Sequence, residues 1–205
     1  MAEVKDWTGN TNSVYKTIAA SNHAEGERQC DDYYATDPVA IEKLLQVYDV
    51  PHHVWECACG AGHLSKALIE SGREVVSTDI KDRGYGYVGI DFLKEPLPEC
   101  LADEGNVCIL TNPPYKFATE FIEHSLAVLP QGQPCVMLLK TTALEGKGRW
   151  ERLYRHGWLQ AVYQFKERLM CAKNGDFGCV NGSAVSYGWF VFSKVPNQRA
   201  SIEWI

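Results

Sequence analysis

HVWECACGAG, residues 53–62, begins as an apolar strand and ends in a glycine turn. Apolar residues at helical spacing follow the turn, so the segment predicts a strand, a tight turn and a helix. The glycines Gly60 and Gly62 let the backbone turn sharply and approach a ligand closely. In open α/β sheets, ligands bind beyond the carboxyl ends of the strands. The turn is therefore a candidate binding loop, although a lone G-x-G is as often purely structural.

Strand and helix patterns alternate along the chain on both sides of this turn. A helix is expected to begin at Thr36, which can act as its cap, with Pro38 in the first turn. Strands alternating with helices predict a mostly parallel sheet with helices on both faces. We therefore expect a single α/β domain over residues 33–205, preceded by a polar segment over residues 1–32. Further strands are expected over residues 74–79, 87–91, 107–112, 134–140, 159–165 and 185–192, and further helices over 117–129 and 149–156.

The composition is that of an ordinary globular protein, with 205 residues of which 45% are hydrophobic and 22% charged. No apolar run is long enough to cross a membrane, and the amino terminus lacks the apolar stretch of a secretory signal. Several of the eight cysteines lie in apolar runs, so we expect free thiols in a cytoplasmic protein. Cys57 and Cys59 are spaced C-x-C without a second matching pair, so no metal site is expected there.

The net charge of −6 limits how the chain can bind nucleic acid. Tight binding that ignores sequence needs clustered lysine and arginine. A local basic face remains compatible with an acidic chain, because binding depends on the local field. The densest basic stretch, residues 147–156, is interleaved with aromatic residues. This pattern is typical of phosphate and base binding, and equally of a solvated amphipathic helix.

Asp79 ends the next expected strand after the glycine turn. An acidic residue about 20 positions past such a turn can accept hydrogen bonds from ribose hydroxyls, although a solvated Asp at a strand end is also common. Ser65 stands where a dinucleotide-binding motif carries its third glycine, which argues against a dinucleotide. Together, the turn and Asp79 indicate a nucleoside-containing cofactor.

The tetrapeptide NPPY, residues 112–115, lies where the fourth expected strand ends. Its two prolines fix φ and hold the turn in one shape. The amino nitrogen of adenine is a poor nucleophile, because its lone pair is conjugated with the ring. Two acceptors on its N–H bonds, the side-chain oxygen of Asn112 and the backbone carbonyl of Pro113, would free that lone pair. Tyr115 could stack on the base, so that catalysis needs positioning rather than a strong general base.

With these motifs the chain resembles the amino-methyltransferase branch of the class I S-adenosylmethionine-dependent methyltransferases, and within it the N6-adenine DNA methyltransferases. The resemblance covers residues 33–192 and is closest to small prophage-type enzymes. It implies a Rossmann-like, seven-stranded, mostly parallel sheet whose last strand is antiparallel. It also implies S-adenosylmethionine as the cofactor and the N6 of adenine in DNA as the methyl acceptor. The catalytic residues that it implies are Asn112, Pro113, Pro114 and Tyr115.

The same resemblance assigns the cofactor contacts. The family binds S-adenosylmethionine with a segment before the first strand, the first turn and the acid before it, and acids after the second and third strands. The matching residues are Tyr34, Thr36, Pro38, Glu56, Cys57, Ala58, Gly60, Gly62, Asp79, Ile80, Asp91 and Phe92.

Residues after the sixth strand supply, in this family, an aromatic side chain that packs on the flipped target base. The glycine-rich segment 174–183 is long and polar for a simple hairpin, which marks it as a candidate functional loop. Together with the basic stretch, these segments give the substrate-binding candidates Lys147, Arg149, Arg152, Phe165, Arg168 and Phe177.

The chain also departs from the family. Ala58 stands where many class I members have a glycine, and no separate target-recognition domain is visible, so we expect a short or loose sequence preference. RNA adenine and protein glutamine N5 pose the same lone-pair problem, and both stay open as acceptors. A cofactor-binding, non-catalytic partner subunit is a further alternative, against which the intact tetrapeptide argues.

Overall fold

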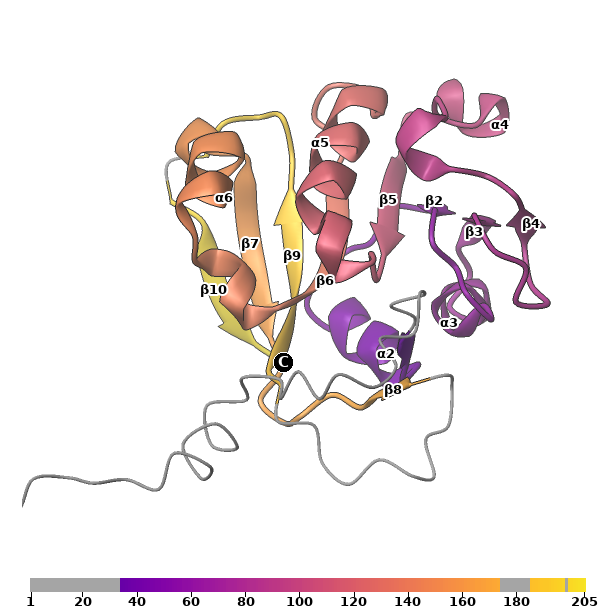
Figure 1. The fold of residues 1–205 in the computed structure, drawn as a ribbon, viewed down its shortest axis with the longest axis horizontal. Coiled ribbons are helices and arrows are strands. Elements are labelled where there is room, and N and C mark those ends of the chain that lie inside the picture. The colour runs from indigo at the N-terminus through magenta and orange to yellow at the C-terminus, as the bar shows by residue number, and fades with distance from the viewer. Residues whose placement is uncertain (1–33, 174–184, 198) are drawn as a thin grey trace, which may run out of the picture. The chain divides into compact units, whose positions relative to one another are not determined.

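The computed structural model describes residues 34–173, 185–197 and 199–205. Its main sheet has eight strands in the order β10-β7-β9-β6-β5-β2-β3-β4, and β1 pairs with β8 in a separate two-stranded sheet (Figure 1). The strands are β1 (Tyr34–Thr36), β2 (His53–Glu56), β3 (Glu74–Asp79), β4 (Tyr87–Val88), β5 (Val107–Thr111), β6 (Cys135–Lys140), β7 (Leu159–Gln164), β8 (Cys171–Lys173), β9 (Tyr187–Phe192) and β10 (Ser201–Trp204). The helices are α2 (Val39–Leu45), α3 (His63–Glu70), α4 (Glu99–Ala102), α5 (Ala118–Val128) and α6 (Lys147–Arg152), with 3-10 turns η1 (Phe92–Lys94), η2 (Tyr115–Phe117), η3 (Thr141–Leu144) and η4 (Tyr154–His156).

The strand order creates a switch point in the main sheet. From β2 the chain moves outward to β3 and β4, and it then returns to place β5 on the other side of β2. Strands β3, β2, β5 and β6 run parallel, whereas β9 is antiparallel to both β6 and β7. The loops that leave the carboxyl ends of β2 and β5 therefore diverge, and such a divergence is where open α/β sheets bind ligands.

Alternate side chains of the strands face two separate apolar cores. Val54 belongs to the core that includes residues of α2 and α3, whereas its neighbour Trp55 belongs to the core that includes residues of α5. Trp189 and Phe190 divide in the same way, and both are fully buried. Figure 1 shows α2 and α3 on one side of the sheet and α4, α5 and α6 on the other. Because both faces are covered, a central strand such as β5 can be buried over its whole length.

The expected fold class, a Rossmann-like α/β domain with a mostly parallel sheet, is confirmed, but the strand count differs by one. The additional strand is β10, which pairs in parallel with β7 at the sheet edge. All four of its residues are exposed, so its sequence lacks the apolar run by which the other strands were identified. The antiparallel strand is consequently β9 and not the last strand of the sheet.

Smaller differences concern the elements that flank the site. Of the strand expected over residues 87–91, only Tyr87 and Val88 pair with β3. At the start of α2, the N–H of Val39 donates to Asp37 Oδ1 over 3.0 Å, so Asp37 takes the capping role that the sequence suggested for Thr36. The segment 174–183 lies outside the described residues. Within the described ranges, no helix combines the length and the apolar character that a membrane span requires.

Candidate functional site

The glycine turn after β2 is tied to the end of β3 by Asp79. The N–H of Gly60 donates to Asp79 Oδ2 over 2.8 Å, and the N–H of Lys81 donates to Oδ1 over 2.8 Å. Asp79 is 8% exposed, and these two backbone donors compensate the burial of its carboxylate. Gly60 and Gly62 have φ angles of 56° and 78°, in the region that favours glycine. Asp79 therefore fixes the shape of the turn as well as ending the strand.

Glu56 lies beneath the turn in a buried polar cluster. Its Oε2 accepts a hydrogen bond from Ser65 Oγ, and Ser65 Oγ lies 2.7 Å from Ser77 Oγ. Glu56 is 1% exposed, and this burial raises its pKa to about 8, against the smaller lowering effect of the hydrogen bond from Ser65. The carboxyl group is therefore mostly neutral at pH 7. It supports the turn from inside the fold.

The raised pKa of Glu56 predicts a pH dependence of stability. The carboxyl group is protonated in the folded chain up to about pH 8 but ionises near pH 4.5 when unfolded, so its contribution is complete below pH 4.5 and is lost as the pH rises through 8. Glu56→Gln should remove this contribution. Urea unfolding of both proteins at pH 5, 6.5 and 8 measures it, and the wild type should lose up to roughly 1 kcal/mol more per pH unit than Glu56→Gln. Parallel pH curves for the two proteins would contradict the assignment.

Tyr85 covers the outer side of the glycine turn. A Cβ at Gly62 would lie 2.3 Å from Tyr85 Cδ1, which shows that the ring packs directly on the glycine. The next residue after Tyr85, Gly86, also approaches the turn, since a Cβ at Gly86 would lie 2.9 Å from Cys59 Sγ. Lys66 places its ammonium 5.0 Å from the centre of the Tyr85 ring. The loop after β3 thus forms a wall of the turn, a contact that no sequence pattern indicated.

Asp91 and Phe92, the pair expected near the cofactor adenine, have separate environments. Asp91 is partly exposed and pairs with Lys94 Nζ over 2.7 Å, and this hydrogen bond lowers the pKa of Asp91. The ring of Phe92 is buried between Trp55 and Phe121, with ring centres 5.0 and 4.8 Å away. The Phe92 ring is therefore a core side chain in this structure.

The remaining cofactor candidates differ in their exposure to solvent. Ile80 follows Asp79 and is 59% exposed, so its side chain is available to cover a ligand. Cys57 is buried, and burial raises the pKa of its thiol, which makes it an inert apolar contact. Ala58 is partly buried and Pro38 is exposed. Tyr34 lies in β1, opposite Lys173 of β8 in the register.

Asn112 directly follows β5, on the other side of the switch point from the glycine turn. Its Nδ2 donates to Thr36 Oγ1 over 2.9 Å, so the amide oxygen points away from Thr36. Thr36 belongs to β1 and is 3% exposed, which gives the contact a fixed place in the fold. The segment expected to line the cofactor pocket therefore contacts the catalytic candidate itself. Pro113 and Pro114 then lead the chain into η2.

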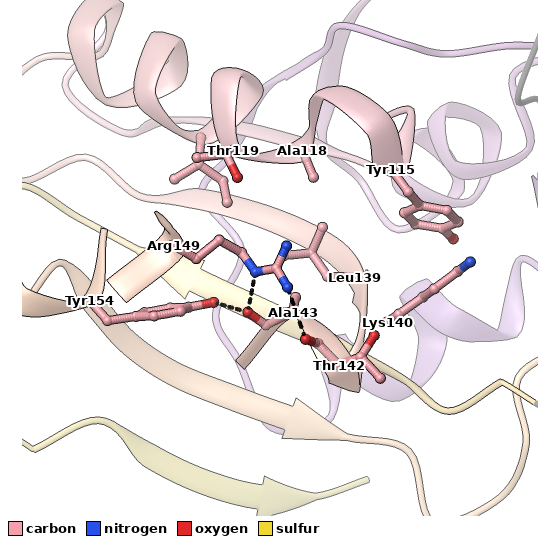
Figure 2. Close-up of a pocket in the computed structure, with 10 residues that line it drawn as sticks. Tyr115, Ala118, Thr119, Leu139, Lys140, Thr142, Ala143, Arg149 and Tyr154 are labelled. Atoms are coloured by element: carbon pink, nitrogen blue, oxygen red, sulfur yellow. Dashed lines mark hydrogen bonds between the residues drawn. The ribbon is translucent and has the colours of Figure 1, made fainter. Parts of the chain in front are cut away.

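Tyr115 begins η2 and lies beside the end of β6. Lys140 Nζ is 4.7 Å from the centre of the Tyr115 ring, a cation–π distance, and Figure 2 shows the ammonium directed toward that ring. A cavity of about 100 Å³ opens next to the pair, and Thr142 and Arg149 also line it. Sequence reasoning missed Lys140. The signal that could have found Lys140 is its position as the charged residue that ends an apolar strand. Like Asn112, it lies at the carboxyl end of a strand of the parallel sheet.

Two of the three arginines of the basic stretch 147–156, Arg149 and Arg152, have intramolecular partners. The guanidinium of Arg149 donates to two backbone carbonyls of η3 over 2.8 and 3.2 Å (Figure 2). Arg152 forms ion pairs with Glu120 and Glu123 of α5, at 2.9 and 2.5 Å. Phosphate binding by either arginine would have to replace these contacts.

The other substrate candidates differ in their access to solvent. Lys147 is exposed, with its ammonium 4.0 Å from Glu151, and Arg168 is also exposed. Phe165 is 6% exposed and packs in the core, so its ring does not offer a face to a base in this conformation. Phe177 lies outside the described residues. Trp150, which was not singled out, is 58% exposed and is the more accessible aromatic side chain.

Comparison with solved structures matches this arrangement of strands to known folds. A proposed class I S-adenosylmethionine-dependent methyltransferase from Listeria monocytogenes superposes with a TM-score of 0.57 at 12% identity, over 88% of this chain and 68% of that one. The modification subunit of a proposed type I restriction enzyme from Vibrio vulnificus gives 0.53 at 14% identity, over 95% of this chain and 50% of that one. This chain has the class I methyltransferase fold.

The likeness is one of fold and does not extend to sequence. A proposed haemolysin from Lactococcus lactis shares the same fold, with a TM-score of 0.54 at 9% identity over 80% of this chain and 91% of that one. No protein-family model matches the sequence, and no curated protein sequence matches it. This chain also spans only half the length of the restriction-enzyme subunit. Function must therefore be argued from the residues of the site.

Proposed function

We propose that the chain is an S-adenosylmethionine-dependent methyltransferase that methylates the N6 amino group of adenine in DNA. The proposal is carried by the position of Asn112 and Tyr115 at the end of β5, across the switch point from the glycine turn of β2. The fold supports methyl transfer in general, and the tetrapeptide supports an amino nitrogen as the acceptor. The structural likeness to a restriction-enzyme modification subunit supports DNA as the substrate.

The residues around the glycine turn fit S-adenosylmethionine. Gly60 brings the backbone of the turn to the sheet edge without a side chain, so a ligand can approach closely. Each carboxylate oxygen of Asp79 accepts one backbone hydrogen bond and retains a further lone pair, which suits a ribose hydroxyl. The exposed side chain of Ile80 adds an apolar surface for an adenine face, and Asp91 adds a second carboxylate. When bound, S-adenosylmethionine supplies an electrophilic methyl group on a sulfonium centre.

Asn112 acts on the target amino group through its amide oxygen. The hydrogen bond from Nδ2 to Thr36 fixes the orientation of the amide group. The Asn112 oxygen and the Pro113 carbonyl would each accept one N–H of the amino group and favour a tetrahedral nitrogen. The lone pair freed by Asn112 and Pro113 would be the nucleophile for the methyl group that bound S-adenosylmethionine would supply, and the surplus amino proton would leave to solvent. Rate enhancement comes from this positioning.

Tyr115 provides the flat surface on which the target base stacks. The ammonium of Lys140 holds the Tyr115 ring by a cation–π contact at 4.7 Å. The cavity beside the pair is next to the stacking surface, so a base extruded from a duplex would have space at this edge of the sheet.

The decisive experiment offers the purified chain and labelled S-adenosylmethionine to three substrates in parallel, namely DNA free of methyladenine, RNA and a protein mixture. Mass spectrometry of the hydrolysed products identifies the modified group. N6-methyldeoxyadenosine is expected. Methylcytosine, or methyl transfer confined to RNA or protein, would overturn the substrate assignment, and transfer to none of them would favour a non-catalytic partner subunit.

Thr36 is expected to act as a positioning residue for Asn112. Thr36→Val keeps the shape of the side chain but removes the hydroxyl that accepts the hydrogen bond from Asn112 Nδ2. We expect kcat to fall about tenfold, the equivalent of one hydrogen bond, with little change in KM for S-adenosylmethionine. Thr36→Ser, which keeps the hydroxyl, should restore kcat. Equal losses in the two variants, or a change confined to KM, would refute this role.

A further inference from the structure

Two histidines and two glutamates lie close together at the amino ends of the strands, whereas Asn112 lies at the carboxyl ends. His52 and His53 lie at the start of β2, Glu74 begins β3, and Glu104 lies in the loop before β5. Glu74 faces both imidazoles, with His52 Nε2 at 3.7 Å from Oε1 and His53 Nδ1 at 3.4 Å from Oε2. One ligand atom from each of these three residues lies within 4.8 Å of the other two.

The backbone fixes three of the four residues before any ligand arrives. His53 is opposite Glu74 in the register of β2 and β3. The N–H of Glu74 donates to the carbonyl of His52 over 2.9 Å, and the N–H of His53 donates to the carbonyl of Asn106 over 3.1 Å. Side chains on paired strand ends start from fixed Cβ positions, so little chain ordering is needed to bring their ligand atoms together.

The two nitrogens of His53 have different partners. Its Nε2 lies 3.1 Å from Glu104 Oε2, while its Nδ1 faces Glu74. A carboxylate on one ring nitrogen fixes the proton there and leaves the lone pair of the other nitrogen available to a metal, the usual arrangement behind metal-binding histidines. The exposed fraction of the His53 side chain is 17%, compared with 49% for His52, so His53 is the better fixed of the two ligands.

The geometry points to a binding site for one divalent transition metal of the zinc class, ligated by His52 Nε2, His53 Nδ1 and Glu74, with Glu104 holding His53. Imidazole and carboxylate ligands suit Zn²⁺, Ni²⁺ and Cu²⁺, whereas Mg²⁺ and Ca²⁺ prefer ligands that are all oxygen. Tetrahedral zinc with bonds near 2 Å places its ligand atoms about 3.3 Å apart. The two histidine–glutamate separations of 3.4 and 3.7 Å are close to this value, and all three ligand atoms lie within 4.8 Å of one another, so side-chain movements alone would complete the geometry.

A metal ion at this site would stabilise the sheet by linking neighbouring strands. The ligands come from β2 and β3, and Glu104 reaches the cluster from the loop before β5, so one ion would link three adjacent strands. A ligand that binds only the folded chain stabilises it by mass action. The inference is independent of the proposed function, since the cluster lies at the amino ends of the strands and the tetrapeptide at the carboxyl ends.

Calorimetry with Zn²⁺ and with Mg²⁺ on the metal-free, tag-free protein tests the site. We expect one Zn²⁺ per chain, no detectable Mg²⁺ binding, and a melting temperature higher by roughly 5–10 °C at free Zn²⁺ about 100 times Kd. His52→Ala/His53→Ala should lose the binding, and Glu104→Gln should weaken it about tenfold while keeping all three ligands. His156→Ala, which removes an exposed histidine elsewhere, is the matched control and should bind as the wild type does.

The eight cysteines could also take up zinc, so the ligands must be identified directly. Co²⁺ replaces Zn²⁺ and gives an intense near-ultraviolet thiolate band only where sulfur is bound. A bound Co²⁺ without this band, lost in His52→Ala/His53→Ala, is the expected result. A thiolate band, equal binding by the double variant, or no Zn²⁺ binding at micromolar concentrations would overturn the site and leave an ordinary histidine–glutamate ion pair.

Discussion

Asn112→Ala is expected to lower kcat for methyl transfer at least about 100-fold while leaving S-adenosylmethionine binding close to that of the wild type. The substitution removes the amide oxygen proposed to hold the amino group of the base, and it also removes the hydrogen bond to Thr36. Asn112 lies at the end of β5, whereas the turn proposed to hold the cofactor follows β2. Single-turnover transfer to DNA measures the first effect, and calorimetry with S-adenosylmethionine measures the second.

Asn112→Asp is the informative companion to this variant. It keeps an acceptor oxygen but loses the N–H that donates to Thr36, so we expect turnover between those of the wild type and Asn112→Ala. Wild-type turnover in Asn112→Ala would show that the tetrapeptide is not catalytic. A parallel loss of cofactor binding would mean that Asn112 serves the cofactor pocket instead.

Gly62→Ala should cost both stability and cofactor affinity. A methyl group at this position would lie 2.3 Å from the Tyr85 ring, and the φ of 78° is unfavourable for any residue with a Cβ. Backbone strain and the forced displacement of the ring each cost about 1–3 kcal/mol, so the free energy of unfolding should fall by about 2–6 kcal/mol. Urea unfolding measures this loss. We also expect S-adenosylmethionine affinity to fall more than about tenfold, because the turn must shift to accommodate the ring.

Two further variants separate the causes. Gly72→Ala has a similar φ of 86° but open space around its Cβ, so it should show the strain cost without the clash. In Gly62→Ala/Tyr85→Ala the ring is gone, and the excess loss over Tyr85→Ala alone should shrink to the cost seen for Gly72→Ala. If Gly62→Ala is no worse than Gly72→Ala, the Tyr85 ring does not pack on the turn in solution.

The fold could be predicted from the sequence because its signals are local. A buried strand reveals itself by a continuous apolar run, as in β5, and a strand-to-helix turn by its glycines, as at Gly60 and Gly62. Both the tetrapeptide and the turn follow the carboxyl ends of parallel strands, so the sequence alone predicts that they lie on the same side of the sheet, where such sheets bind ligands. Strand β10 escaped this reasoning because its exposed residues carry no apolar run, and it pairs with β7 at the outer edge.

The contacts that shape the site could not be predicted, because they join residues far apart in sequence. Thr36 was expected to cap α2 and to line the cofactor pocket, but its hydroxyl accepts a hydrogen bond from Asn112, 76 positions away. Nothing in the residues around Tyr85 indicates that its ring covers Gly62. The basic stretch was identified correctly as a feature of the sequence, yet only coordinates reveal that Arg152 pairs with Glu120 and Glu123.

The position of β9 between β6 and β7 has a consequence for how the chain folds. Residues 135–140 and 159–164 leave the ribosome first, but in the native sheet each of these strands pairs with β9 and not with the other. Trp189 and Phe190, which fill both cores, also arrive only with β9. Until then, β6 and β7 have unpaired edges that could pair wrongly, and closing the native pairing requires contacts of long sequence separation. Folding of the sheet should therefore be slow and must await the synthesis of β9.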